Sequence, residues 1–574
     1  MKLSRRDFIK QVAGSTIALG FLNIGYAKQR SNSSDITIIL GRPTDKSITL
    51  NIMSHNEFEA YVEYGKVSGS YSNQSNNSTI SSDSANVILL GNLLSNTRYY
   101  YSLKYKVNHE TDYNSMEEYS FHTQRIAGSE FTFTLQSDSH LLTKKHCDPK
   151  LYIKTLLNAK NDNPDFHFDL GDTFRTTKIK NPTFASIKEL HRTHRDYFGL
   201  LCHSAPLFFV LGNHEAELGW LLDGTENNPA VWSAKSRKMH YSNPIPNEFY
   251  TGDSVEQDFV GLREDYYAYQ WGDALFVAID PYWYTTEHDD PSDYGSPNDR
   301  WNITIGDEQY FWLKETLKNS NAKYKFVFCH HLHGQARGGV EIASLYEWGG
   351  HHTNGDYLFN EKRPGWEKPI HQLMVENGVT IFFQGHDHIF AKQELDGIIY
   401  QTIPMPADPT FTPYNIDAFP KGDKLPNAGH LRVKVSEQKI LVEYIRAFLP
   451  KDEVNGHVNG EIAFSYEIGS STGLDKSNKH FPKQFNLQQN YPNPFNPTTN
   501  IKYELHLQSR VVMKIYDNCG NLVNELVNSL HEAGNYVISW NGTDFKGNPV
   551  ASGNYFCELI AGNFRETKKM IFMK

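Results

Sequence analysis

Five short apolar runs that each end in polar side chains constrain the fold of this sequence most strongly. Runs of this length and composition are typical of buried strands. Strands that stop in Asp, Asn or His deliver polar groups to the edge of a sheet, where open α/β folds keep their sites. The runs and the residues that follow them are 131–135 with Asp138 and His140, 166–170 with Asp172, 206–210 with Asn213 and His214, 326–329 with His330 and His331, and 381–383 with His386 and His388.

The side chains at these strand ends are oxygen and nitrogen donors that suit zinc, manganese or iron. Residues two apart on an extended segment point to the same side, so Asp138 with His140, and His386 with His388, can each converge on one centre. Each motif alone is weak, because a histidine beside an apolar strand is more often a satisfied core or surface residue. Five motifs in order, all at strand ends, favour a shared metal centre over coincidence.

Length and charge narrow the function classes. At 574 residues the chain is too long for one core, and two to four domains are expected. A net charge of -10 argues against a nucleic-acid-binding surface. Small phosphate substrates stay possible, because the positive charge of a local metal centre can outweigh the net negative charge of the protein. Five cysteines without a Cys-x-x-Cys pair argue against a disulfide scaffold or a thiolate metal site.

Residues 1–27 have the composition of an export signal. The segment begins with the pair Arg5 and Arg6, followed by Phe8, Ile9 and Lys10. A modest apolar run and a cleavage site with small residues come next, and the whole pattern resembles a twin-arginine signal. The alternatives are a plain secretory signal or an anchor helix, although the run is too short and too broken by glycine to span a bilayer. No other stretch is long and apolar enough, so we expect an exported protein without a transmembrane helix, located in the periplasm and then at the cell surface or secreted.

Residues 35–124 read as short strands separated by Gly, Asn and Ser turns. The pattern resembles the fibronectin type III β-sandwich found ahead of purple acid phosphatase catalytic domains, with Tyr99 or Tyr101 as its corner tyrosine. From 130 to 469, strand-like runs alternate with helix-like segments such as 149–160 and 306–317, which implies α/β layering. Within this domain we expect 217–261 to be a long irregular insert that forms a lid or rim.

The C-terminal part begins with a Ser/Gly/Lys-rich linker at 470–484. Residues 485–574 resemble the sorting domain of type IX secretion cargo, through the entry motif at 491–499 and the exit motif at 569–574. The alternative is a generic immunoglobulin-like module that binds carbohydrate or protein. The expected partners are therefore the export and sorting machinery and a small phosphoester substrate.

The order of the five blocks resembles the calcineurin-like metallophosphoesterases over most of 131–446. The resemblance implies a central α/β domain with a two-layer β-sandwich flanked by helices. With the two terminal segments described above, the expected fold is multidomain, with all-β immunoglobulin-like domains at both ends. It also implies two metal ions of the Fe, Mn or Zn type at one sheet edge. Asp138, His140, Asp172 and His388 would hold the first ion, and Asp172 would bridge to a second held by Asn213, His330 and His386.

The same resemblance implies the chemistry. A metal-bridging hydroxide would attack phosphorus while His214 protonates the leaving group, and Glu215 would orient the site from outside the ligand shell. Purple acid phosphatases carry a tyrosine where this chain has Arg175, so we expect neither their charge-transfer colour nor an obligatory ferric–divalent pair. Arg175 would either clamp a phosphate oxygen or be solvated or ion-paired. His331 and His333 are further candidates for substrate contacts.

These observations predict an exported phosphatase that hydrolyses phosphomonoesters. A phosphodiesterase or nucleotidase acting on extracellular nucleotides is the main enzymatic alternative, because the same dimetal site serves both reactions. A surface binding protein without activity is an alternative of another class. It is disfavoured because every expected ligand block is filled. Substrate, metal identity, pH optimum, oligomeric state and cleavage of the sorting domain stay open.

Overall fold

The computed structural model describes two compact units, which divide between residues 468 and 469. The predicted export signal and the linker at 470–484 lie outside the described residues. Within the described part of the chain, no helix combines the length and apolarity needed to cross a membrane. The described residues are 36–107, 110–287, 299–332, 337–454, 456–469, 485–490, 492–505, 509–531, 534–562 and 564–573.

The first unit begins with a β-sandwich. One sheet has the order β1-β2-β6, and the other is built around the long pair β3 and β7. Buried Phe58, Ala60 and Val62 alternate with more exposed neighbours along β3, as a strand with one face on the core requires. The hydroxyl of Tyr99 accepts a hydrogen bond from the backbone of Leu94, 3.0 Å away, which is the geometry of a corner tyrosine. The strands are β1 Thr37–Gly41, β2 Ile48–Met53, β3 Phe58–Gly65, β4 Asn73–Gln74, β5 Ser78–Ile80, β6 Asn86–Leu90, β7 Arg98–Val107, β8 Asn114–Ser115 and β9 Tyr119–His122.

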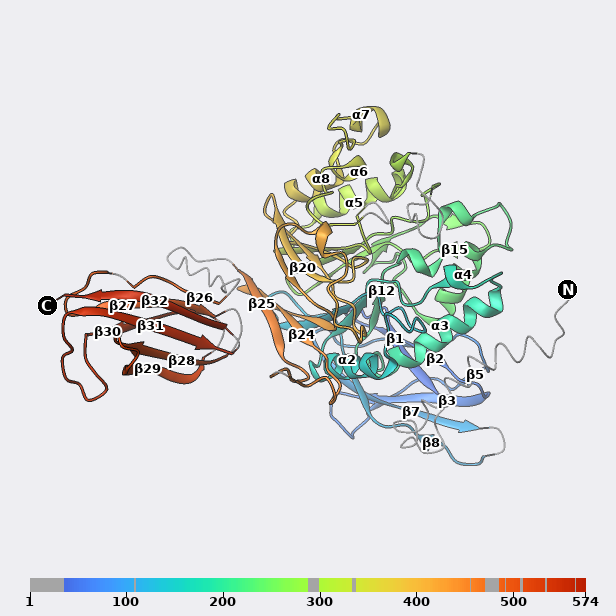
Figure 1. The fold of residues 1–574 in the computed structure, drawn as a ribbon. Coiled ribbons are helices and arrows are strands. Elements are labelled where there is room, and N and C mark those ends of the chain that lie inside the picture. Colours follow the sequence, from blue (N-terminus) through green and yellow to red (C-terminus); the bar gives the residue numbers. More distant parts are fainter. Residues whose placement is uncertain are drawn as a thin grey trace, which may run out of the picture. The chain divides into compact units, whose positions relative to one another are not determined.

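Two mixed sheets form the central domain (Figure 1). The first has the order β12-β11-β10-β23-β24-β25, and β10, β11 and β12 run parallel. Its strands are β10 Phe131–Gln136, β11 Phe166–Asp169, β12 Leu207–Phe209, β23 Gly429–Val435, β24 Lys439–Arg446 and β25 Ile462–Gly469.

The second central sheet has the order β13-β16-β17-β18-β19-β21-β20-β22, with β17, β18, β19 and β21 parallel. The short pair β14 Glu256–Gln257 and β15 Gly261–Leu262 stands apart from it. The strands of the second central sheet are β13 Thr251–Gly252, β16 Tyr267–Trp271, β17 Ala274–Ala278, β18 Tyr324–Phe328, β19 Ile381–Gln384, β20 Phe390–Leu395, β21 Ile398–Thr402 and β22 Asp423–Leu425.

Aromatic side chains fill the space between the two central sheets. Phe168 of the first sheet stacks on Phe328 of the second with ring centroids 4.1 Å apart. Phe133 of the first sheet likewise packs on Phe326 and Phe383 of the second sheet. Each of these rings is fully buried, which contributes about 1.5–3 kcal/mol per side chain. This shared core places the carboxyl ends of β10, β11 and β12 beside those of β18 and β19.

Helices cover the outer faces of the two sheets (Figure 1). The predicted segments 149–160 and 306–317 correspond to α2 and α5. The expectation of an irregular insert at 217–261 is wrong in part, because Asn228 caps the helix α4 and Pro229 starts it. The helices are α2 Pro149–Asn161, α3 Phe184–Phe198, α4 Pro229–His240, α5 Asp307–Asn319, α6 Tyr346–Gly349, α7 Phe359–Lys362 and α8 Ile370–Glu376, with short 3-10 turns η3 Thr176–Lys178, η4 Asn213–Glu215, η5 Gly219–Leu221, η6 Arg300–Asn302 and η7 Ile416–Ala418.

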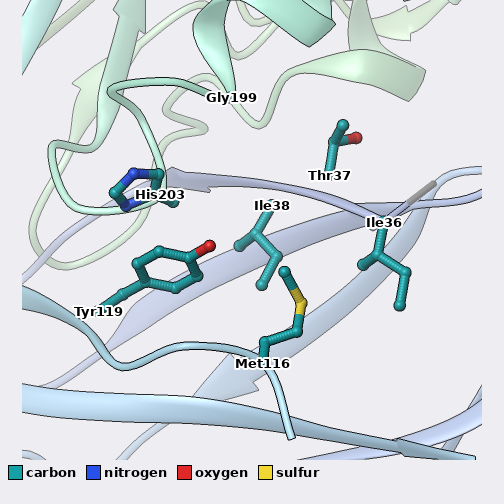
Figure 2. A pocket seen from close by; sticks show the side chains of 7 residues that line it. All are labelled: Ile36, Thr37, Ile38, Met116, Tyr119, Gly199 and His203. Atoms are coloured by element: carbon teal, nitrogen blue, oxygen red, sulfur yellow. The ribbon is translucent and has the colours of Figure 1, made fainter. Parts of the chain in front are cut away.

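The N-terminal sandwich docks on α3 of the central domain. The buried guanidinium of Arg195 donates to the backbone carbonyls of Thr37 and Asn51, at 3.0 and 2.6 Å. A small pocket lies at this seam, and within it the ring of His203 stacks on Tyr119 at 4.0 Å (Figure 2). None of the residues lining the pocket belongs to the predicted metal site.

The second unit is a separate β-sandwich with two sheets, ordered β26-β27-β30 and β29-β28-β31-β32. Phe495 of the entry motif is buried against Trp540, with ring centroids 5.5 Å apart, and its backbone pairs with the exit strand at Phe572. The entry and exit motifs therefore meet in one fold. The strands are β26 Asn486–Leu487, β27 Thr499–Leu505, β28 Ser509–Tyr516, β29 Leu522–His531, β30 Gly534–Trp540, β31 Gly553–Ala561 and β32 Phe564–Phe572.

Candidate metal centre

The carboxyl ends of five strands from the two sheets meet at one edge of the central sandwich. The loops after β10, β11 and β12 face the loops after β18 and β19, because the two sheets share one core. Donor atoms from these loops form clusters whose members all lie within 4.8 Å of one another. Those clusters are Asp138, His140 and His388; His140, Asp172 and His214; and Asp172, His330 and His386.

Asp138, His140 and His388 form one half of the centre. The Nε2 atom of His388 lies 3.2 Å from Asp138 Oδ1 and 2.9 Å from His140 Nε2. His140 Nε2 is also 3.6 Å from Asp138 Oδ1. Asp138 Oδ2 accepts the backbone N–H of His386 at 2.7 Å, which fixes the carboxylate and leaves Oδ1 facing the imidazoles.

Asp172, His330 and His386 form the other half. Asp172 Oδ2 lies 3.4 Å from His330 Nε2 and 3.9 Å from His140 Nε2, so this one oxygen faces both halves. His330 Nε2 is 3.2 Å from His386 Nδ1. The Oδ1 atom of Asn213 is buried and has no hydrogen-bond partner among the described residues, as expected of an amide oxygen that is kept for a cation.

His214 lies beside both halves. Its Nε2 is 3.8 Å from Asp172 Oδ2, its ring centroid is 5.4 Å from that of His140, and its backbone N–H donates to Asp172 Oδ1 at 2.9 Å. The side chain is 7% exposed, whereas that of His330 is fully buried. His214 therefore keeps residual access to solvent, as does His388, whose side chain is 14% exposed.

The backbone is strained at most of the predicted ligands. Asp138, His140, Asp172, His386 and His388 have φ angles of 60°, 42°, 54°, 68° and 56°. Left-handed backbone at residues other than glycine costs about 1–3 kcal/mol each and persists where the surrounding structure imposes it. Such strain clusters at functional sites. The pairs Asp138 with His140, and His386 with His388, therefore lie on left-handed backbone and not on the extended segments expected from the sequence.

Glu215 holds the loops that present these side chains. Its buried carboxylate accepts backbone N–H groups of Gly212, Asp172 and Thr173 at 2.7, 2.9 and 2.8 Å. It also accepts the Thr173 hydroxyl at 2.9 Å. Both carboxylate oxygens are thus engaged with the protein, which fits a supporting position outside the ligand shell.

Electrostatics keep part of the donor set in the form that binds cations. Burial, followed by the neighbouring His388, holds the pKa of His140 well below its usual range, so its imidazole is neutral. Burial raises the pKa of Asp172, but His330 and His214 outweigh it and keep the carboxyl ionised. Burial alone would lower the pKa of His330. The adjacent carboxylate of Asp172 has the opposite effect, and the pKa of His330 is raised to about 9.

Three residues were predicted to contact the substrate, and the structure describes two of them. His331 is fully buried, and its Nε2 lies 3.1 Å from Asp387 Oδ2 and 2.9 Å from the carbonyl of Gly338. The ring nitrogens of His331 thus bind the protein interior, which does not support the predicted substrate contact. His333 lies outside the described residues. Arg175 is half-buried, and its charge acts on His140.

A buried polar network behind the centre was not predicted from the sequence. Ser139 Oγ and the Tyr152 hydroxyl both lie 3.0 Å from His194 Nε2, and Ser139 Oγ also donates to the Thr173 carbonyl at 3.2 Å. This network ties the loop after β10 to the loop after β11. Ser139 lies inside a recognised motif, but His194 on α3 has no local sequence signal, since only the fold brings it near.

The donor set fits divalent cations. Three carboxylate or amide oxygens and four imidazoles suit zinc, manganese or iron better than calcium or magnesium. Asp138, His140 and His388 fall within the first predicted ligand group. Asp172, His330 and His386 fall within the second, and Asp172 faces both. The buried Oδ1 atom of Asn213, which has no hydrogen-bond partner among the described residues, points to the same conclusion, because buried polar atoms are rarely left without a partner.

Comparisons with known proteins agree with this geometry. Residues 131–390 match the calcineurin-like phosphoesterase family, and residues 494–563 match the FlgD Ig-like domain. The chain therefore contains a calcineurin-like phosphoesterase domain followed by an Ig-like domain. No curated protein matches the chain.

The chain is similar to two solved structures at low sequence identity. A structure of PhoD aligns with a TM-score of 0.53 and 13% identity, over 75% of this chain and 90% of that chain. A purple acid phosphatase, PPD1 from yellow lupin (Lupinus luteus) seeds, aligns with a TM-score of 0.49 and 16% identity, over 75% of this chain and 74% of that chain. At 13% identity, the likeness to PhoD concerns the fold alone.

Proposed function

We propose that this protein is an exported, metal-dependent phosphatase that hydrolyses phosphomonoesters. The observation that supports this most directly is the convergence of Asp138, Asp172, His330 and their neighbours into clusters with donor atoms within 4.8 Å. The match of residues 131–390 to the calcineurin-like phosphoesterases supports the reaction class. An inactive binding protein would have no need to keep this strained and buried donor set intact.

The proposed ligand sets follow the two halves of the centre. Asp138, His140, Asp172 and His388 hold one ion. Asp172, Asn213, His330 and His386 hold the other, with Asp172 shared. Two adjacent cations would neutralise phosphoryl oxygens and lower the pKa of a coordinated water, and this is the chemistry the ions supply when bound.

The protein's own groups divide the remaining work. His214, beside Asp172 and with residual solvent access, would donate a proton to the oxygen of the leaving alcohol. Its backbone hydrogen bond to Asp172 holds the main chain of His214 beside the centre. Arg175 would contact a phosphoryl oxygen, supported by its half-buried position close to His140. Glu215 would keep the Asp172 loop in place through its four hydrogen bonds.

The phosphodiesterase alternative uses the same centre, so a direct comparison must decide between them. Purified protein supplied with manganese, zinc or iron would be assayed with an aryl phosphomonoester and with the bis-ester of the same alcohol. A kcat/KM at least tenfold higher for the monoester is expected. A preference for the bis-ester would assign the protein to the phosphodiesterases instead.

We further propose the domain assignment and the export route. Residues 1–27 would be a twin-arginine signal, 35–124 a fibronectin type III-like sandwich, and 130–469 the catalytic domain. After a linker at 470–484, residues 485–574 would be a type IX sorting domain, which the Ig-like match at 494–563 supports at the level of fold. Replacing Arg5 and Arg6 by lysine should retain the protein in the cytoplasm, whereas removing 485–574 should retain it in the periplasm. Unchanged cell fractionation in either variant would argue against that step.

A further inference from the structure

His146 stands immediately outside the ligand clusters. It lies on the loop between β10 and α2, and its ring centroid is 5.8 Å from His140 and 5.4 Å from His388. Its nitrogens belong to none of the donor clusters found among the described residues. His146 is half-buried, whereas His140 is 1% exposed. The ring therefore lies next to the proposed ligands, on a side that solvent reaches.

One ring nitrogen of His146 lacks a protein partner. Its Nδ1 atom is buried and makes no hydrogen bond within the described part of the chain. Buried polar side-chain atoms in native proteins are rarely left in this state, and each exception requires an explanation. A bound group at this side of the centre would provide one.

A neighbouring loop holds the His146 ring in this position. Tyr414 lies with its ring centroid 5.2 Å from His146 and 6.0 Å from His388. The backbone N–H of Tyr414 donates to the His388 carbonyl at 3.2 Å. The Tyr414 hydroxyl lies 3.2 Å from the hydroxyl of Thr410. The loop is thus anchored to the same segment that presents His388.

The charges around His146 are mainly positive. Lys145 lies over the Tyr414 ring, with Nζ 5.5 Å from the centroid, and Lys145 and Arg175 both act repulsively on a protonated His146. Asp408 acts in the opposite sense. Its carboxylate already accepts the backbone N–H of Thr410 at 2.9 Å and further protein donors. The Asp408 carboxylate is therefore already engaged by protein donors.

We propose that His146, flanked by Lys145 and Arg175, forms a subsite that binds the non-bridging oxygens of a dianionic phosphoryl group beside the Asp138 half of the centre. The inference rests on the proposed phosphatase function and deepens it. A phosphomonoester presents three terminal oxygens and two negative charges, whereas a diester presents two oxygens, one charge and a second organic group. Extra donors and positive charge at one side of the centre therefore favour the monoester.

The test separates phosphate binding from catalysis. Metal-loaded wild type, His146→Ala and His146→Gln would be titrated calorimetrically with orthophosphate at alkaline pH, where it is dianionic, and with dimethyl phosphate. His457→Ala is the control, because His457 is exposed on a surface loop. We expect His146→Ala to weaken orthophosphate binding about tenfold, as loss of a hydrogen bond to a charged group does. Dimethyl phosphate should be affected less than about threefold, and His146→Gln should recover part of the loss.

Activity measurements on the same proteins complete the test. His146→Ala should lower kcat/KM for an aryl phosphomonoester about tenfold with unchanged metal content, and should leave the rate on the bis-ester nearly unchanged. Equal losses for both ligands, unchanged orthophosphate binding, or loss of metal in His146→Ala would each overturn the subsite. A wild type that binds orthophosphate through His146 but hydrolyses no ester would refute the proposed function and leave the subsite standing.

Discussion

The carboxylate of Glu215 accepts the backbone N–H of Asp172 at 2.9 Å, and so joins the loop after β12 to the loop after β11. Gly212 and Thr173 donate to the same carboxylate. The residue that faces both halves of the centre is thus held through its backbone, while its side chain stays available. Burial and, after it, the nearby charge of Asp172 raise the pKa of Glu215 to about 7.

Replacing Glu215 by Gln should destabilise the folded protein and loosen the centre. One carboxylate oxygen becomes an NH₂ group that faces backbone donors, so at least one buried N–H loses its acceptor. The expected loss is about 1–3 kcal/mol in the free energy of unfolding, measured by urea denaturation of the metal-free protein. An unchanged unfolding midpoint would show that the Glu215 hydrogen bonds do not stabilise these loops.

Replacing His214 by Ala should separate metal binding from turnover. We expect metal content to stay at the wild-type level, because each half of the centre retains its proposed ligands. Turnover of a phosphomonoester should fall by about 10²–10⁴, as loss of a general acid does. The effect should be smaller for esters of acidic phenols, whose leaving groups need no proton. If metal is lost together with activity, His214 is a ligand rather than the acid; His457→Ala is the matched control.

A substitution at Gly385 tests how closely the loop after β19 packs on the loop after β10, which carries Asp138. A Cβ atom at this position would lie 1.9 Å from Ser137 Oγ and 2.7 Å from Asp138 Oδ2. Gly385→Ala should displace Asp138 and reduce metal content, while the circular dichroism spectrum stays native. Gly91→Ala is the control, because nothing lies within 4 Å of the Cβ built there. Full metal content in Gly385→Ala would mean that Asp138 tolerates displacement and is not a required ligand.

Arg195 tests the docking of the N-terminal sandwich. Its guanidinium is fully buried and bonds the backbone carbonyls of Thr37 and Asn51. Arg195→Met would leave several buried acceptors unpaired and should lower the free energy of unfolding by about 3–5 kcal/mol. Arg192→Ala on the same helix is partly exposed and should cost less than about 1 kcal/mol. Similar losses in the two variants would argue against a docking role for Arg195.

Much of the candidate centre could be predicted because its proposed ligands sit at strand ends with a recognisable order. Asp138, Asp172 and His330 follow apolar runs whose period and length identify buried strands. The orientation of His331 could not be predicted, since the direction of two adjacent histidines after a strand depends on how the loop turns. Helix α4 was missed because the Asn- and Trp-rich composition outweighed the helix start signal at Asn228 and Pro229.

The residues that sequence reasoning missed are those brought in by tertiary structure alone. His194 lies on α3, far in sequence from Ser139, and meets it only because the helix packs behind the centre. His146 reaches His388 in the same way, across 242 positions of the chain, as the residue numbers show. A single histidine in a polar loop carries no local pattern that distinguishes it from a solvated residue.

The most direct test of the central claim is elemental analysis of the purified full-length protein together with a phosphomonoester assay on the same sample. The account predicts about two transition-metal ions per chain and hydrolysis that a chelator abolishes and added manganese, zinc or iron restores. Asp172→Asn, which weakens both halves at once, should reduce both the metal content and the rate. A protein purified without metal, and inactive after each of these ions is added, would contradict the account.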